Sequence, residues 1–131
     1  METDYQTLRI LIADDSKEFS ESLREYLELR RGLHVVGNAC NGLEAIVLAN
    51  SLEPNVILMD INMPEMNGID AARQIKRGHP ETKIYFVTVH TENTFKALAK
   101  LIPAEGFISK NCLEEGVDEI LENYNSNLLS A

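Results

Sequence analysis

The chain has 131 residues, which is enough for one domain that buries roughly two-thirds of its unfolded surface. Its composition, 44% hydrophobic and 25% charged, is that of an ordinary globular protein. The net charge of −9, from 12 basic and 21 acidic residues, argues against a chain that itself grips a nucleic-acid backbone, because that contact needs a basic surface.

Five apolar runs alternate with segments of helical periodicity. The predicted strands are 8–13, 33–39, 56–59, 83–89 and 106–109. The predicted helices run from the Ser16 cap to Gly32, from Asn41-Gly42 to about Leu52, from Ile69 to Lys76, from Thr91 to Pro103, and from Asn111 to about Tyr124. Residues 125–131 are expected to begin a linker or tail, so that one domain spans residues 1–131 with its core at roughly 8–124.

Each predicted helix has an apolar face that would pack on a sheet. In the second helix the spacing places Leu43, Ile46, Val47 and Ala49 inward. In the last helix the inward stripe is Leu113, Val117, Ile120, Leu121 and Tyr124. The acidic residues elsewhere on that helix are expected to form a solvated face.

The strict alternation of strand and helix indicates a parallel sheet with helices on both faces. A closed barrel would need eight such units and about 250 residues. We therefore predict an α/β fold: a doubly wound, five-stranded parallel sheet built from five strand–helix units, with strand order 2-1-3-4-5.

Polar residues suited to phosphate chemistry stand at the ends of four predicted strands. Asp14 and Asp15 follow the first strand, Asp60 follows the third, Thr88 lies at the end of the fourth, and Lys110 follows the fifth. The first and third strands would be neighbours roughly 4.8 Å apart, so the three aspartates should meet at the switch point of the sheet. Taken alone, Asp60 could equally be a helix cap or a turn residue.

Three crowded carboxylates repel one another, so such a site needs a cation. Oxygen ligands without histidine or cysteine favour Mg²⁺. A carboxylate in this setting can attack phosphorus and form an acyl phosphate, and Asp60 is the candidate because it is central to all the groups.

Several motifs together resemble the receiver domain of two-component response regulators. They are the acidic pair 14–15, the segment Met-Asp-Ile-Asn-Met-Pro-Glu-Met-Asn-Gly at 59–68, Val87-Thr88, and Gly-Phe-Ile-Ser-Lys at 106–110. The resemblance covers roughly Leu8 to Tyr124. It implies a flavodoxin-like fold and a signalling switch, not an enzyme, with Asp60 taking a phosphoryl group from a sensor histidine kinase.

The resemblance also implies ligands for Mg²⁺. Asp15, Asp60 and the backbone carbonyl of Asn62 would bind the ion directly, and Asp14 would bind it through water.

Further roles follow from the resemblance. Lys110 would pair with the phosphate, Thr88 would close on it, and Phe107 would rotate inward as the aromatic switch. The fourth helix, fifth strand and fifth helix would form the signalling surface and the face for a homodimer.

The resemblance also implies that three positions flanking the site tune the rate of dephosphorylation, which varies across the family. They are Asn62, Val89 and His90. Val89 stands where receivers usually have a small residue, so we expect it to narrow access to the phosphoryl site. His90 is either a hydrogen-bonding partner for water or a solvent-facing loop histidine. Pro103 is unusual, and Asn111 stands where a proline with a cis bond often follows the lysine, so a different loop geometry is expected.

Two other classes of function compete with a receiver. A phosphatase that forms an aspartyl phosphate commonly carries a second aspartate two residues after its nucleophile, where this chain has Asn62. A pseudo-receiver that only binds partners is supported by Val89 alone.

The segment from His34 to Ala45 resembles receivers that precede a helix-turn-helix output domain. We therefore expect a regulator of transcription that contacts DNA only through a domain outside this chain. The alternative is a stand-alone receiver that acts through protein contacts.

No apolar run approaches the roughly 18 residues of a membrane span, and residues 1–4 do not resemble a signal peptide. A cytoplasmic protein without membrane contact is expected. Cys40 and Cys112 lack metal or redox spacing, so we expect buried or incidental thiols.

Overall fold

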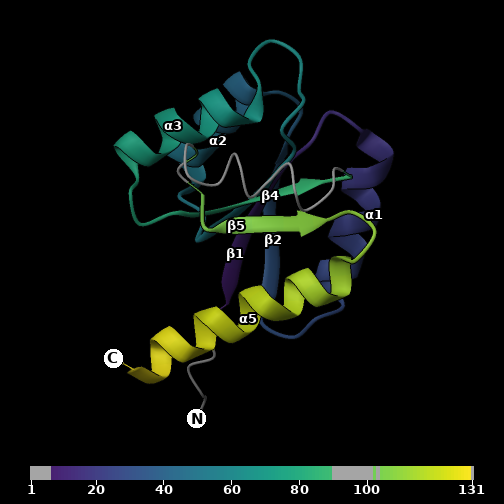
Figure 1. Cartoon of the computed structure of the whole chain (residues 1–131), viewed down its shortest axis with the longest axis vertical. Coiled ribbons are helices and arrows are strands. Elements are labelled where there is room, and N and C mark those ends of the chain that lie inside the picture. The colour runs from purple at the N-terminus through teal and green to yellow at the C-terminus, as the bar shows by residue number, and fades with distance from the viewer. Residues whose placement is uncertain (1–6, 90–101, 103, 131) are drawn as a thin grey trace.

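The computed structural model describes residues 7–89, 102 and 104–130, with side chains described as far as Tyr124. Five parallel strands form one sheet in the order β2-β1-β3-β4-β5 (Figure 1). The strands are β1 (Leu8–Ala13), β2 (Leu33–Ala39), β3 (Val56–Met59), β4 (Lys83–Thr88) and β5 (Gly106–Ser109). The predicted doubly wound sheet and its strand order are confirmed.

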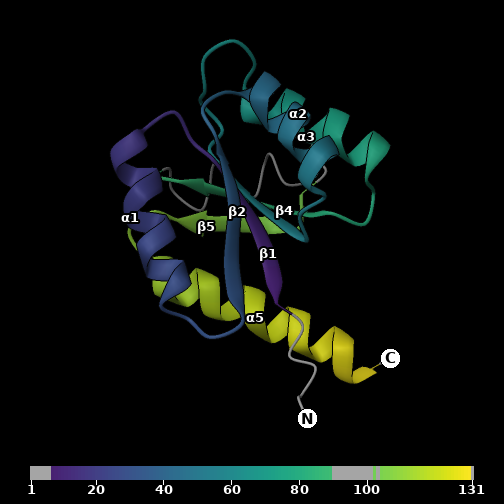
Figure 2. The same cartoon turned by 180° about the vertical axis from the view of Figure 1, so that it is seen from behind.

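Helices cover both faces of the sheet. They are α1 (Lys17–Glu28), α2 (Gly42–Leu52), α3 (Gly68–Gly78) and α5 (Leu113–Ser130). The front and back views show α2 and α3 together on one face, with α1 and α5 on the other (Figures 1 and 2). The predicted fourth helix, from Thr91 to Pro103, lies outside the described residues apart from the buried Ile102.

Successive residues of the strands belong to two separate cores. In β1, Ile10 and Ile12 pack toward α1 and α5, whereas Leu11 and Ala13 pack toward α2 and α3. Because side chains alternate along a strand and both faces are covered, a central strand must be apolar at every position. This is the physical reason for the continuous apolar run in β3, where all residues from Val56 to Met59 are buried.

Asparagine and serine side chains begin three of the helices. The side chains of Ser16, Asn41 and Asn67 accept hydrogen bonds from the backbone N–H groups three residues ahead, at 3.2, 2.8 and 2.9 Å. Such caps satisfy N–H groups that have no partner within the helix. The Asn67 cap starts α3 at Gly68, one residue before the predicted start at Ile69.

The inward face of α2 matches the prediction at Ala49 and at the partly buried Ile46, but differs from it at Leu43 and Val47. Leu43 and Val47 are 45% and 61% exposed, whereas Ala45 and Ala49 are buried. These two alanines lie one turn apart on the face opposite Leu43 and Val47. Small side chains on the buried face let α2 lie close to α3 and β2, which are its main neighbours.

Two further expectations, both about the ends of elements, are wrong. Strand β4 ends at Thr88 instead of Val89. Helix α5 continues to Ser130 instead of ending near Tyr124, since residues 125–130 contain no glycine or proline to stop it. The thiols of Cys40 and Cys112 are free and exposed, so of the two expected possibilities they are not buried but are compatible with incidental thiols.

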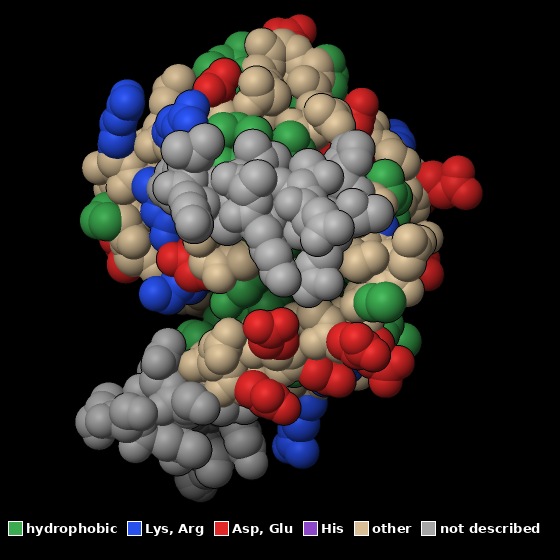
Figure 3. Space-filling model, in the orientation of Figure 1, with side chains coloured by type: hydrophobic (Ala, Val, Ile, Leu, Met, Phe, Trp, Pro, Cys, Tyr) green, Lys and Arg blue, Asp and Glu red, His purple; other side chains and the backbone are tan. Residues whose placement is uncertain are grey.

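The acidic side chains of α5 form a solvated face, as expected. Figure 3 shows these carboxylates gathered along the helix on one side of the molecule. Asp118 is the member of this group that pairs with Arg30 of α1. The other acidic residues, Glu114, Glu115, Glu119 and Glu122, are exposed. Among the described residues, no helix is long and apolar enough to cross a bilayer.

Candidate functional site

The three predicted aspartates meet where β1 and β3 end side by side. Ala13 and Met59 are register partners, and the backbone N–H of Asp60 donates to the Ala13 carbonyl at 2.8 Å. One carboxylate oxygen from each of Asp14, Asp15 and Asp60 lies within 4.8 Å of the others. The structure therefore brings residues from two distant parts of the sequence into one acidic cluster.

Asp14 is held firmly in this cluster. Its side chain is only 3% exposed, and its Oδ1 accepts a hydrogen bond from the Ser16 backbone N–H at 2.8 Å. Its own backbone N–H donates to the Ala39 carbonyl at 2.9 Å, which ties it to the end of β2. Asp15 next to it is exposed, so the cluster opens toward solvent on that side.

Asp60 is more enclosed than an ordinary surface carboxylate. Burial raises the pKa of its carboxyl group above the ordinary value, and the nearby charge of Asp14 raises this pKa further. The ammonium group of Lys110 and the backbone groups of Ile61 and Asn62, which hydrogen bond to the carboxylate, act in the opposite direction. On balance the pKa of Asp60 lies above its ordinary value, and further positive charge nearby would lower it.

Among the described residues, Lys110 brings a positive charge to this cluster. Its Nζ lies 2.9 Å from Asp14 Oδ2 and 3.9 Å from Asp60 Oδ2. The backbone N–H of Lys110 donates to the Thr88 carbonyl at 2.8 Å, which fixes the start of the side chain at the ends of β4 and β5. The same Nζ also lies 4.3 Å from the centre of the Phe19 ring.

The loop after Asp60 folds back tightly onto the strand end. The Gly68 backbone N–H donates to the Ile61 carbonyl at 2.7 Å. A Cβ atom on Gly68 would lie 2.1 Å from the Asp60 carbonyl oxygen, so only glycine fits there. A Cβ on Gly42, at the start of α2, would likewise meet the Met66 carbonyl at 2.2 Å. These two glycines let α2 and α3 begin directly against the loop.

The predicted switch residues lie at the same sheet edge. Thr88 is buried at the end of β4. The ring of Phe107 is partly buried and stacks on Phe86, with ring centres 5.8 Å apart. Val89 is 64% exposed, and His90 lies outside the described residues.

The donor set suits a small hard cation. It consists of carboxylate oxygens with no histidine or thiol among them, and within the described residues it is the one group of three or more such side chains placed to share an ion. Carboxylate-only sites of this kind favour Mg²⁺ over zinc or copper. The raised pKa of Asp60 fits the same interpretation, because a divalent cation would offset the repulsion.

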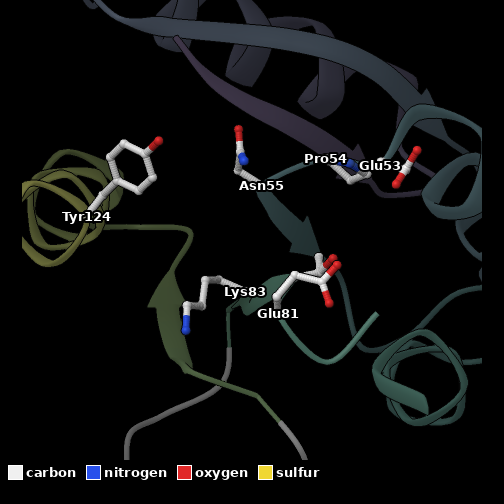
Figure 4. Close-up of a pocket in the computed structure, with 7 residues that line it drawn as sticks. Glu53, Pro54, Asn55, Glu81, Lys83 and Tyr124 are labelled. Atoms are coloured by element: carbon white, nitrogen blue, oxygen red, sulfur yellow. The ribbon is translucent and has the colours of Figure 1, made fainter. Parts of the chain in front are cut away.

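A pocket lies at the edge of the sheet opposite the acidic cluster (Figure 4). It has a volume of about 310 Å³, and its lining includes Asn55, Lys83 and Tyr124. Asn55 precedes β3 and Lys83 begins β4, whereas Asp60 and Thr88 stand at the far ends of these strands. This pocket is therefore separate from the acidic cluster.

The sequence and fold were compared with known proteins. A family model described as the response regulator receiver domain matches residues 10–122. The chain belongs to the response regulator receiver family. It is 37% identical over 129 residues to a protein-glutamate methylesterase/protein-glutamine glutaminase from Methanosarcina acetivorans, and 34% identical over 115 residues to the response regulator GacA from Pseudomonas protegens.

These receiver relatives are longer than the present chain. The match covers 92% of this chain but 37% of the methylesterase, and 88% of this chain but 53% of GacA. Among solved structures, a LuxR-family response regulator from Aurantimonas matches with a TM-score of 0.80 and 30% identity, covering 90% of this chain and 87% of that one. The chain thus spans about two-fifths and about half of the lengths of these two curated relatives.

Two features of this receiver site were missed by the sequence reasoning. The contact of Phe19 with Lys110 has no signal in local sequence. The need for glycine at position 68 has a weak signal, since Asn-Gly is a common turn pair, but the backbone contact with Asp60 depends on the folded loop.

Proposed function

We propose that this receiver is a phosphorylation-activated switch in which Asp60 accepts a phosphoryl group from a histidine kinase. The observation that carries the proposal is the placement of a half-buried carboxylate, Asp60, between two other aspartates and the ammonium group of Lys110. Three clustered aspartates and one lysine match what phosphoryl transfer requires. The requirements are a nucleophile, a cation site and a positive charge for the phosphoryl oxygens.

In the proposed reaction, a carboxylate oxygen of Asp60 attacks the phosphorus atom carried by the kinase histidine. The new bond joins that oxygen to phosphorus, the bond between phosphorus and the histidine nitrogen breaks, and the electron pair returns to the imidazole. Lys110 and the Thr88 hydroxyl would bind the phosphoryl oxygens. Lys110 is already within 3.9 Å of Asp60, so a small movement suffices.

Asp14, Asp15, Asp60 and the backbone carbonyl of Asn62 would hold Mg²⁺, with Asp14 acting through water. When bound, the ion supplies positive charge that offsets the carboxylates and the incoming phosphoryl group. The proposal is supported by the 4.8 Å grouping of the three carboxylates.

The proposed response to phosphorylation is a closure of Thr88 on the phosphoryl group and an inward rotation of Phe107. The stacking of Phe107 on Phe86 gives its ring a defined resting position from which to move. Asn62, Val89 and His90 would set the rate of dephosphorylation. The fourth helix, β5 and α5 would carry the signal and form a homodimer face.

The proposed output is control of transcription through a DNA-binding domain joined to the receiver. The similarity to the response regulator GacA and to a LuxR-family response regulator supports it. A methylesterase output is a second candidate, because the Methanosarcina relative has that activity in its name. With a histidine kinase as phosphodonor, the proposed compartment is the cytoplasm.

The test of the proposed switch is phosphorylation of Asp60 by a small phosphodonor. Incubation with acetyl phosphate and Mg²⁺ should add one phosphoryl group to the chain, measured by intact-protein mass spectrometry. Asp60→Asn removes the nucleophilic oxygen and should abolish the added mass, while Asp70→Asn, which changes an exposed carboxylate on α3, should label as the parent does. Equal labelling of Asp60→Asn, or none of the parent, would refute the proposal.

A further inference from the structure

The ammonium group of Lys110 has an aromatic neighbour as well as two carboxylate neighbours. Its Nζ lies 4.3 Å from the centre of the Phe19 ring, 2.9 Å from Asp14 Oδ2 and 3.9 Å from Asp60 Oδ2. A cation within about 6 Å of a ring centre is attracted by the negative face of the ring. Because the lysine side chain is only 19% exposed, water screens this attraction weakly.

We propose that Phe19 is a positioning residue that holds the Lys110 ammonium group beside Asp60. This inference rests on the proposed function of the site, since it assigns Phe19 a role in presenting Lys110 to the phosphoryl group. In this role the residue acts through Lys110 and not on the reacting atoms themselves.

Lys110 needs a second attachment because its closest partner, Asp14, belongs to the proposed cation site. The lysine would have to share the Asp14 charge with the bound ion, which weakens the 2.9 Å ion pair. The attraction to the ring does not depend on that carboxylate. It is also less directional than a hydrogen bond, so the ammonium group can move from Asp14 toward Asp60 while remaining on the ring face.

The ring and Asp14 are placed by the same turn of the chain. The Ser16 backbone N–H donates to Asp14 Oδ1 at 2.8 Å, and the Ser16 hydroxyl accepts from the Phe19 backbone N–H at 3.2 Å. Phe19 also packs against the core cluster under α1 and α5. The N-cap of α1 therefore fixes the acidic and the aromatic partner of Lys110 relative to each other.

The first measurement is the rate of labelling by acetyl phosphate at saturating Mg²⁺. Phe19→Leu keeps an apolar side chain but removes the ring, and it should slow labelling about two- to fivefold. Phe19→Tyr keeps the ring and should restore the parental rate. Tyr26→Leu is the matched control: it removes an aromatic contact with Arg30 two turns further along α1 and should leave the rate unchanged.

The second measurement separates an effect through Lys110 from a general loss of packing. In a Lys110→Met background, Phe19→Leu should produce no further change in rate, because the cation that the ring holds is gone. The ε-methylene protons of Lys110 should show an upfield ring-current shift by NMR in the parent and in Phe19→Tyr. That shift should be lost in Phe19→Leu.

The outcomes distinguish the two proposals. No labelling of the parent overturns the proposed function, while the NMR shift, measured on the unphosphorylated chain, still tests the contact. Two results would overturn the role of Phe19 alone while the parent labels normally. In one, Phe19→Leu labels as fast as the parent; in the other, Phe19→Leu slows labelling equally with Lys110 and with Met at position 110. An unshifted Lys110 methylene signal in the parent overturns it as well.

Discussion

At the scale of single residues, the site depends on how closely backbone atoms approach one another. Gly68 shows this most directly, because its missing side chain lets the loop after Asp60 close against the strand end. The side chains of the proposed site stand on this backbone frame. Asp14 is held by the Ser16 N–H, and Asp60 is oriented by hydrogen bonds from Ile61 and Asn62.

Gly68→Ala should therefore destabilise the fold. Its Cβ would lie 2.1 Å from the Asp60 carbonyl oxygen, a backbone atom that cannot move aside cheaply. We expect the free energy of unfolding to fall by about 1–3 kcal/mol or more, measured by urea denaturation. Gly78→Ala is the control within the same helix, since a Cβ there meets nothing within 4 Å. Equal stability of the two variants would contradict this account of the loop.

At the scale of elements, α2 shows how packing can override a pattern. The helix is apolar around most of its circumference, so the sequence offers several candidate faces. The structure buries Ala45 and Ala49, because α2 packs closely against α3 and β2. Leu43 and Val47 remain exposed as a consequence.

Polar substitutions should separate the two faces of α2. Leu43→Gln and Val47→Gln should each change the free energy of unfolding by less than about 0.5 kcal/mol, because both residues are exposed on the helix surface. Ala45→Gln and Ala49→Gln should each cost several times more, since a longer polar side chain must enter a packed interface. Urea denaturation of the four variants measures these free energies of unfolding. A large loss of stability in Val47→Gln would show that Val47 is on the buried face, as the sequence predicted.

The parts of the structure that the sequence predicted are those governed by local rules. Strand positions followed from continuous apolar runs, and the meeting of Asp14 with Asp60 followed from strand order, because parallel strands all end at one edge. The inward face of α2 and the contact of Phe19 with Lys110 depend on which elements pack together and how closely. No local pattern encodes that distance, so these features required the folded structure.

At the scale of the whole molecule, charge is the property that phosphorylation changes most. The chain already carries a net charge of −9. Converting the Asp60 carboxylate, of charge −1, into an acyl phosphate of about −1.5 to −2 makes the chain more negative by about 0.5 to 1 charge at neutral pH. The labelled chain should therefore elute later from an anion-exchange column than the unlabelled chain. Asp60→Asn treated with the same phosphodonor should show no such shift, and a shift in that variant would indicate modification at another position.

The ion pair between Lys110 and Asp14 has a consequence for how the chain matures. Its two partners are 96 positions apart, and β1, β3, β4 and β5 must all be in place before they meet. A growing chain that has emerged only as far as β4 would possess Asp60 but not its lysine. Competence for phosphoryl transfer would thus arise only once the chain has been made beyond Lys110.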